Sequence, residues 1–193
     1  QRLEGVYSKL QVFKLFDDDP YWKSKRVCML DCDMMIRHHS DNMWSFPTPS
    51  AVMRGNTDTA AHTQRPAHTY YFDGDIEKYE RGGVKMMGGI NGGLIFFTPD
   101  AEEFEEMMKY ICSGEWKAHT QMAEQEFLSH WFGREGRWYA MPPEYNFQLH
   151  HVFLSGQWWP PNGQVRASKY YQMLNDTKII KNWHFSGEKE PFD

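Results

Sequence analysis

The sequence predicts a single α/β domain, in which a sheet is flanked by helices. Short apolar runs that suit strands alternate with longer segments whose apolar residues recur at helical spacing. The chain has 193 residues, of which 40% are hydrophobic and 24% charged, and this composition excludes a disordered protein. No repeat or linker divides the chain, so we expect residues 1–193 to form one domain. Ligands of such a fold collect at the carboxyl ends of the strands, where we expect Asp31, Asn91 and His184.

The first part of the chain predicts a helix, a strand and a long loop. Apolar residues from Leu3 to Phe13 recur at helical spacing and are followed by an acidic stretch and Pro20, which predicts an amphipathic helix. The apolar run 27–30 predicts a buried strand that ends at an acidic pair. Residues 45–89 are rich in Pro, Gly, Thr and His and predict a loop.

The second part returns to strands and helices. Residues 93–97 predict a strand, after which Thr98 can cap a helix and Pro99 can occupy its first turn. We expect this helix to turn its apolar residues inward and its glutamates, Glu103 among them, to solvent. Three more elements follow, namely a helix over 124–132, a strand over 138–141 and a last strand over 178–183.

Charge and cysteine content restrict the class of partner. With 21 Lys+Arg against 26 Asp+Glu, the net charge of −5 argues against nucleic acid as a partner. No apolar stretch approaches the roughly 18 residues of a membrane span. Three cysteines are a small and odd number, which argues against a disulfide framework. They fit a reducing compartment, so we expect a cytoplasmic protein. Because the chain opens with Gln1, a leader could precede it, and a Golgi luminal domain stays an alternative. The sequence does not indicate an oligomeric state.

Two acidic residues and a distant histidine are candidates for a metal site. Alternate residues of an extended strand point to one side, so Asp31 and Asp33 can present their carboxylates to the same point. Two such charges need a cation; their oxygens suit Mg²⁺ or Mn²⁺, and the ion could bind a diphosphate. His184 could complete the site. The alternatives are a structural turn for the acidic pair and hydrogen-bonded packing for the histidine.

The glycine-rich run 88–93 leaves the backbone bare around one amide side chain, that of Asn91. Such a backbone allows close approach by a polar ligand. The alternative is a glycine turn between strands.

Five segments together resemble a known family. In chain order they cover 30–36, 90–96, 124–128, 145–146 and 184–187. Their order and rough spacing resemble those of the glycogenin-like glycosyltransferases of family 8, and the resemblance extends over nearly the whole chain. It implies a GT-A type nucleotide-diphospho-sugar transferase fold, with a mixed sheet flanked by helices. It also implies that the family's first nucleotide-binding strand is missing here, so that residues 1–193 are an amino-terminally incomplete catalytic domain.

The resemblance further implies a retaining transfer of a hexose from a UDP-sugar to an acceptor hydroxyl. The implied cofactor is Mn²⁺, with Mg²⁺ as a possible substitute, and the acceptor would be a carbohydrate, a polyol or a protein. The implied site has metal ligands Asp31, Asp33 and His184; donor-binding residues Asp31, Asn91, Gly92, Gly93, Gly187 and Lys189; and catalytic residues Glu124 and Gln125.

The sequence departs from the family pattern at two places. Position 124 is Glu where many members have Asp. Glu190 stands where the family has its diphosphate-binding lysine, and a carboxylate would repel a phosphate. Lys189 could serve instead after a shift of one residue.

Two other functions remain open from the sequence. An apolar strand ending in Asp-x-Asp also describes the phosphatases of the haloacid dehalogenase type, with Asp31 as nucleophile. That family expects Thr or Val where this chain has Met35, and its later acidic metal motif is not evident. The second alternative is a non-catalytic relative of the transferases that binds sugar, which Glu190 and the missing first strand motivate.

Overall fold

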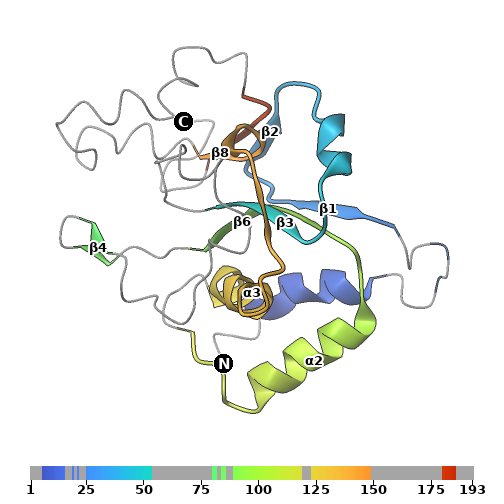
Figure 1. Ribbon diagram of the computed structural model, residues 1–193, viewed down its shortest axis with the longest axis vertical. Coiled ribbons are helices and arrows are strands. Elements are labelled where there is room, and N and C mark those ends of the chain that lie inside the picture. Colours follow the sequence, from blue (N-terminus) through green and yellow to red (C-terminus); the bar gives the residue numbers. More distant parts are fainter. Residues whose placement is uncertain are drawn as a thin grey trace.

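In the computed structural model the larger β-sheet lies between a smaller, three-stranded sheet above it and helices below it (Figure 1). The structure describes residues 6–15, 19, 21, 25–53, 80–81, 84–85, 89–118, 123–148 and 180–185.

The larger sheet has four strands in the order β1-β6-β3-β7. Their bounds are Val27–Leu30 for β1, Ile90–Phe97 for β6, Ser50–Met53 for β3 and Tyr139–Met141 for β7. Strand β6 runs antiparallel to β1 and to β3, whereas β3 runs parallel to β7. The sheet is therefore mixed.

Strand β6 is the centre of the fold, because all eight of its residues are buried. Ile95 and Phe97 pack with the helices on one face, and Leu94 and Phe96 pack in a second cluster on the other. A strand covered on both faces reads as a continuous apolar run rather than an alternating one. The predicted strand 93–97 is confirmed and extends back to Ile90.

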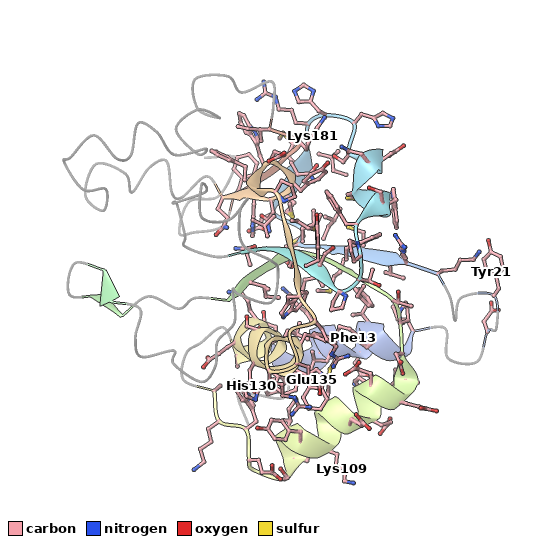
Figure 2. The ribbon with its side chains drawn as sticks, in the orientation of Figure 1. Phe13, Tyr21, Lys109, His130, Glu135 and Lys181 are labelled. Atoms are coloured by element: carbon pink, nitrogen blue, oxygen red, sulfur yellow. The ribbon has the colours of Figure 1, made fainter. Side chains whose placement is uncertain are left out.

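Three helices cover one face of this sheet (Figure 1): η1 over Val6–Lys14, α2 over Ala101–Cys112 and α3 over Ala123–Gly133. Figure 2 shows the side chains between these helices and the sheet, with Phe13 of η1 among them. The buried residues that the helices contribute to this core are Leu10, Phe13, Phe104, Met107, Phe127, Leu128, Trp131 and Phe132.

The helices differ from expectation in three details. The first has 3₁₀ rather than α geometry. The carboxylate of Asp100, not the hydroxyl of Thr98, caps α2 by accepting a hydrogen bond from the Glu103 backbone N–H at 3.0 Å. The side chain of Glu103 is only 16% exposed rather than solvated, because it pairs with Arg137.

The smaller sheet has the order β2-β9-β8. Its strands are Met34–Ile36, Asn182–His184 and Phe147–Gln148, respectively. Strand β9 is antiparallel to β2 and parallel to β8. The last strand was expected over 178–183; within the described residues it begins at Asn182 and includes His184. The remaining short elements are η2 over Asp41–Ser45, β4 over Glu80–Arg81, β5 over Val84–Lys85 and η5 over Pro143–Tyr145.

Two other predictions were wrong in part. Strand β1 is half-buried rather than buried, and its Leu30 is 39% exposed. The region expected as one long loop contains β3, which lies between β6 and β7. Its residues Ser50, Ala51 and Val52 are buried because both neighbouring positions in the sheet are filled.

Cys28, Cys32 and Cys112 are free thiols. In the described part of the chain, no helix combines the length and the apolar character that crossing a membrane requires.

Candidate metal centre

The candidate site lies where β1 ends and β6 begins. The Asp31 backbone N–H donates to the Gly93 carbonyl at 2.8 Å, which continues the antiparallel pairing of the two strands. Asn91 was expected near the carboxyl end of a strand. It lies instead at the amino end of β6, and the antiparallel pairing brings it beside the carboxyl end of β1.

A tight turn, rather than an extended strand, brings the two aspartates together. The Met34 backbone N–H donates to the Asp31 carbonyl at 3.2 Å, so residues 31–34 reverse the chain between β1 and β2. The Asp33 carbonyl then accepts a hydrogen bond from the Phe185 backbone N–H at 3.0 Å. This bond ties the turn to the end of β9, which carries the histidine.

The three candidate metal ligands lie together. One ligand atom from each of Asp31, Asp33 and His184 can be chosen so that all three lie within 4.8 Å of one another. His184 Nε2 lies 3.3 Å from Asp33 Oδ1. His184 is buried, whereas the aspartates are half-buried. Residues far apart in the sequence therefore form one cluster.

The residues of this cluster fit a divalent cation. Asp33 Oδ1 is shielded from solvent and has no hydrogen-bond partner in the described part of the chain, which is costly for a charged oxygen. Burial lowers the pKa of His184, and the nearby carboxylates of Asp33 and Asp31 offset this only in part. A neutral imidazole can offer a lone pair to a metal. Two carboxylates and one imidazole suit a divalent metal ion, and neighbouring ligands around such an ion lie about 3 Å apart.

Lys9 lies at the edge of the cluster. Its ammonium is 2.7 Å from Asp31 Oδ1 and 3.7 Å from Glu124 Oε1. Burial lowers the pKa of Lys9, but the bond to Asp31 and the surrounding carboxylates outweigh this and raise it, so the charge is retained. Lys9 was missed from the sequence, because nothing distinguishes it from the other polar residues of an amphipathic helix.

Two consecutive backbone amides at the start of β6 are bound by side-chain amides. The Gly92 N–H donates to Gln125 Oε1 at 2.6 Å, and the Gly93 N–H donates to Asn91 Oδ1 at 2.9 Å. A Cβ at Gly93 would lie 2.2 Å from His184 Cε1, so the imidazole can occupy its place only beside glycine. At Gly92 a Cβ would lie 3.2 Å from Gln125 Oε1.

Asn146 connects the glycine segment to the histidine. Its Nδ2 donates to Asn91 Oδ1 at 2.8 Å, and its Oδ1 is 2.9 Å from His184 Nδ1. Asn146 is fully buried. The sequence placed it in a matching segment, but gave no signal of this role because the contact depends on the pairing of β8 with β9.

The structure thus brings together most of the expected site residues: Asp31, Asp33, Asn91, Gly92, Gly93, Gln125 and His184, with Glu124 reached through Lys9. Gly187, Lys189 and Glu190 lie outside the described residues.

Comparison by sequence gives a distant relative. No protein-family model matches the chain. Protein R707 of Acanthamoeba polyphaga mimivirus, described as uncharacterized, is 25% identical over 192 residues, which cover 100% of this chain and 56% of R707. The chain therefore spans about half the length of this curated relative.

Comparison by structure gives glycosyltransferases. The apo structure of WbbM, a bifunctional glycosyltransferase, has a TM-score of 0.59 at 17% identity and covers 96% of this chain and 32% of its own. GlyE of Streptococcus pneumoniae TIGR4 has a TM-score of 0.57 at 11% identity, with 97% and 38% covered. The galactosyltransferase LgtC, solved with donor and acceptor sugar analogues, has a TM-score of 0.55 at 15% identity, with 97% and 60% covered. At these identities the likeness concerns the fold: the chain has the GT-A fold of these glycosyltransferases, as the resemblance predicted.

Proposed function

We propose that this chain belongs to a retaining glycosyltransferase that transfers a hexose from a UDP-sugar to an acceptor hydroxyl and depends on Mn²⁺. The GT-A fold supports this proposal, as does the family 8 resemblance of the five segments. The observation that carries it is the convergence of Asp31, Asp33 and His184 on one point, where a solvent-shielded oxygen of Asp33 has no hydrogen-bond partner in the described part of the chain.

The residues of the chain would each have a distinct part in donor binding. Asp31, Asp33 and His184 would hold the divalent ion. When bound, the ion would supply positive charge to the diphosphate that departs with the nucleotide. Lys9, whose ammonium lies beside Asp31, would add a second positive charge at the same edge.

Other residues would shape the place of the sugar. Gly92 and Gly93 leave the backbone without side chains there, and Gln125 and Asn91 hold that backbone by hydrogen bonds. The carboxylate of Glu124 is 19% exposed and 3.7 Å from the Lys9 ammonium. Glu124 is therefore the candidate nucleophile at the sugar's anomeric carbon, if the leaving phosphate does not itself assist the acceptor.

The test is the turnover of UDP-glucose and UDP-galactose by the full-length protein, followed as UDP release with Mn²⁺ and with a chelator. We expect turnover that requires Mn²⁺ and falls about 100-fold or more in Asp33→Asn, because the substitution removes a charged ligand from the transition-state environment. Asp41→Asn is the matched control, because its carboxylate is 77% exposed and approaches only His39 at 3.5 Å among the described residues.

Three outcomes would contradict the proposal. Undiminished turnover in Asp33→Asn would reject the metal assignment. Hydrolysis of an aryl phosphate without UDP release would favour the phosphatase alternative, to which the GT-A fold gives no support. Binding of Mn²⁺ and UDP by the full-length protein, without turnover in the presence of any acceptor or of water, would favour a non-catalytic sugar-binding relative.

A further inference from the structure

A chain of buried hydrogen bonds runs from the backbone of β6 to His184. It passes from the Gly93 N–H through the side chains of Asn91 and Asn146 to the imidazole. All three side chains are buried, with exposed fractions of 5% for Asn91, 0% for Asn146 and 3% for His184. Buried polar groups of this kind must pair donor with acceptor at every step.

The backbone N–H of Gly93 determines which atom donates and which accepts in each of these hydrogen bonds. The Gly93 N–H can only donate, so the atom of Asn91 that it meets is the carbonyl oxygen. The same oxygen lies 2.8 Å from the Asn146 amide group, which must therefore turn its NH₂ towards it. An amide has its oxygen on the other side, so Asn146 Oδ1 faces His184.

The direction of these hydrogen bonds also determines which nitrogen of His184 carries the proton. Asn146 Oδ1 can only accept, and His184 Nδ1 lies 2.9 Å from it, so Nδ1 carries the proton. A neutral imidazole has one N–H, which leaves a lone pair on Nε2. That nitrogen is 3.3 Å from Asp33 Oδ1, so two acceptor atoms face each other across the candidate ion site.

We propose that Asn146 is a positioning residue that holds His184 in the Nδ1–H tautomer and so keeps its Nε2 available as a metal ligand. The metal-ligand part of this inference rests on the proposed function; the tautomer does not. With the proton on Nε2, His184 would instead donate to Asp33 Oδ1, and both groups would be satisfied without an ion. Asn146 thus decides whether His184 is a ligand or a packing residue.

The first test reads the tautomer directly in the metal-free protein. Long-range ¹H–¹⁵N correlation spectra of the histidine-labelled full-length protein, with His184 assigned through its backbone, distinguish a protonated Nδ1 from a protonated Nε2. We expect Nδ1–H for His184. Observation of Nε2–H, or of an even mixture of the two tautomers, overturns the proposal.

The second test removes the hydrogen bonds while nearly preserving volume. In Asn146→Leu we expect loss of the single tautomer and a Kd for Mn²⁺ that is about 10–100-fold weaker, measured by calorimetry without donor. Gln148→Leu is the matched control, because Gln148 lies two residues beyond Asn146, in β8, is fully buried, and has an amide with no hydrogen-bond partner in the described part of the chain. We expect it to retain both the tautomer and the Mn²⁺ affinity.

A conservative variant should preserve the relay. In Asn91→Asp a carboxylate oxygen can still accept from both Gly93 and Asn146, so the Nδ1–H tautomer should persist. Loss of the tautomer in Asn91→Asp or in Gln148→Leu would contradict the proposed path. If His184 has the Nδ1–H tautomer but the protein binds no Mn²⁺, the proposed function fails and the role of Asn146 in setting the tautomer stands.

Discussion

Two carboxylates of this protein, those of Glu103 and Asp33, differ in how their charge is met: the side chain of Glu103 is 16% exposed and that of Asp33 is 38% exposed. Glu103 accepts hydrogen bonds from two nitrogens of Arg137, one of them at 2.7 Å, and from the Trp131 indole. Asp33 Oδ1 has an imidazole nitrogen of His184 at 3.3 Å and no hydrogen-bond partner in the described part of the chain. The charge of Glu103 is thus balanced by hydrogen bonds from other residues of the protein, whereas the charge of Asp33 is not.

This difference separates a structural ion pair from a ligand site. Burial alone would raise the pKa of Glu103, but the hydrogen bonds from Arg137 and Trp131 outweigh it and lower the pKa. The same bonds join α2 to α3 and to the segment before β7. Asp33 is held by its backbone instead, through the bond from Phe185. A carboxylate that the fold holds in place without giving it a hydrogen-bond donor is available to bind a ligand such as a cation.

The largest effect is expected from the backbone beneath the metal site. Gly93→Ala would put a Cβ 2.2 Å from His184 Cε1 and 2.9 Å from Asn91 Oδ1. We expect a loss of about 3 kcal/mol in the free energy of unfolding and no measurable Mn²⁺ binding, since the ring must move. Urea denaturation and calorimetry measure the two.

Gly114→Ala is the control for Gly93→Ala. Gly114 has a φ of 79° and no atom of the described residues within 4 Å of an added Cβ, so only backbone strain of about 1 kcal/mol is expected, with Mn²⁺ binding intact. Equal losses of stability in the two variants would show that the imidazole does not need the space at Gly93.

The second effect contrasts the two carboxylates directly. Glu103→Gln should lower the free energy of unfolding by about 2 kcal/mol, because it leaves Arg137 without its charged partner; the 32% exposure of Arg137 keeps the loss below that of a fully buried pair. Asp33→Asn should change it by less than about 0.5 kcal/mol in a chelator, or stabilise. Urea denaturation of both variants checks this, and the reverse order would abolish the distinction between the two sites.

The third effect concerns Lys9, which we expect to compete with an ion for Asp31 when no donor is bound. Lys9→Met removes a positive charge 2.7 Å from Asp31 Oδ1. In the absence of donor we expect the Kd for Mn²⁺ to fall about fivefold, or about 1 kcal/mol, because the lysine is 36% exposed and partly screened. Titration with Mn²⁺ measures it; weaker binding would mean that Lys9 supports the site rather than competing for it.

The smallest effect is the pH dependence of the Glu103 pair. Because the pKa of Glu103 is lowered from its ordinary value of 4.5, its stabilisation is complete above that value and is lost as the pH falls through the lower, folded pKa. The difference in melting temperature between the wild type and Glu103→Gln should therefore be constant near pH 6 and shrink below about pH 4.5. A difference that does not shrink would assign the stabilisation to packing.

The elements that the sequence predicted well are those with a strong local pattern. Strand β6 and helix α3 have continuous or periodic apolar residues, and both were located within a few positions. Strand β3 was missed because Ser50, Ala51 and Val52 form a short run after a proline-rich segment. Only its neighbours in the sheet, β6 and β7, make it a strand.

The site was predicted through the order of its motifs rather than through geometry. Asp31, Asp33 and His184 were correctly grouped, but the turn that joins the aspartates was expected as an extended strand. Lys9 and Asn146 were not identified, because their roles depend on how η1 packs and how β8 pairs. Contacts of this kind are set by tertiary structure and leave no trace in spacing along the chain.

The pairing of β2 with β9 also has a consequence for biosynthesis. Translation delivers both aspartates before the imidazole, which emerges from the ribosome only after almost all the other residues described above. A nascent chain that ends before His184 therefore has the two aspartates without the third proposed ligand, and it cannot bind an ion as the proposed site would. Metal binding at the proposed site would then have to wait until His184 has been synthesised, so products that terminate before His184 should not bind the ion there.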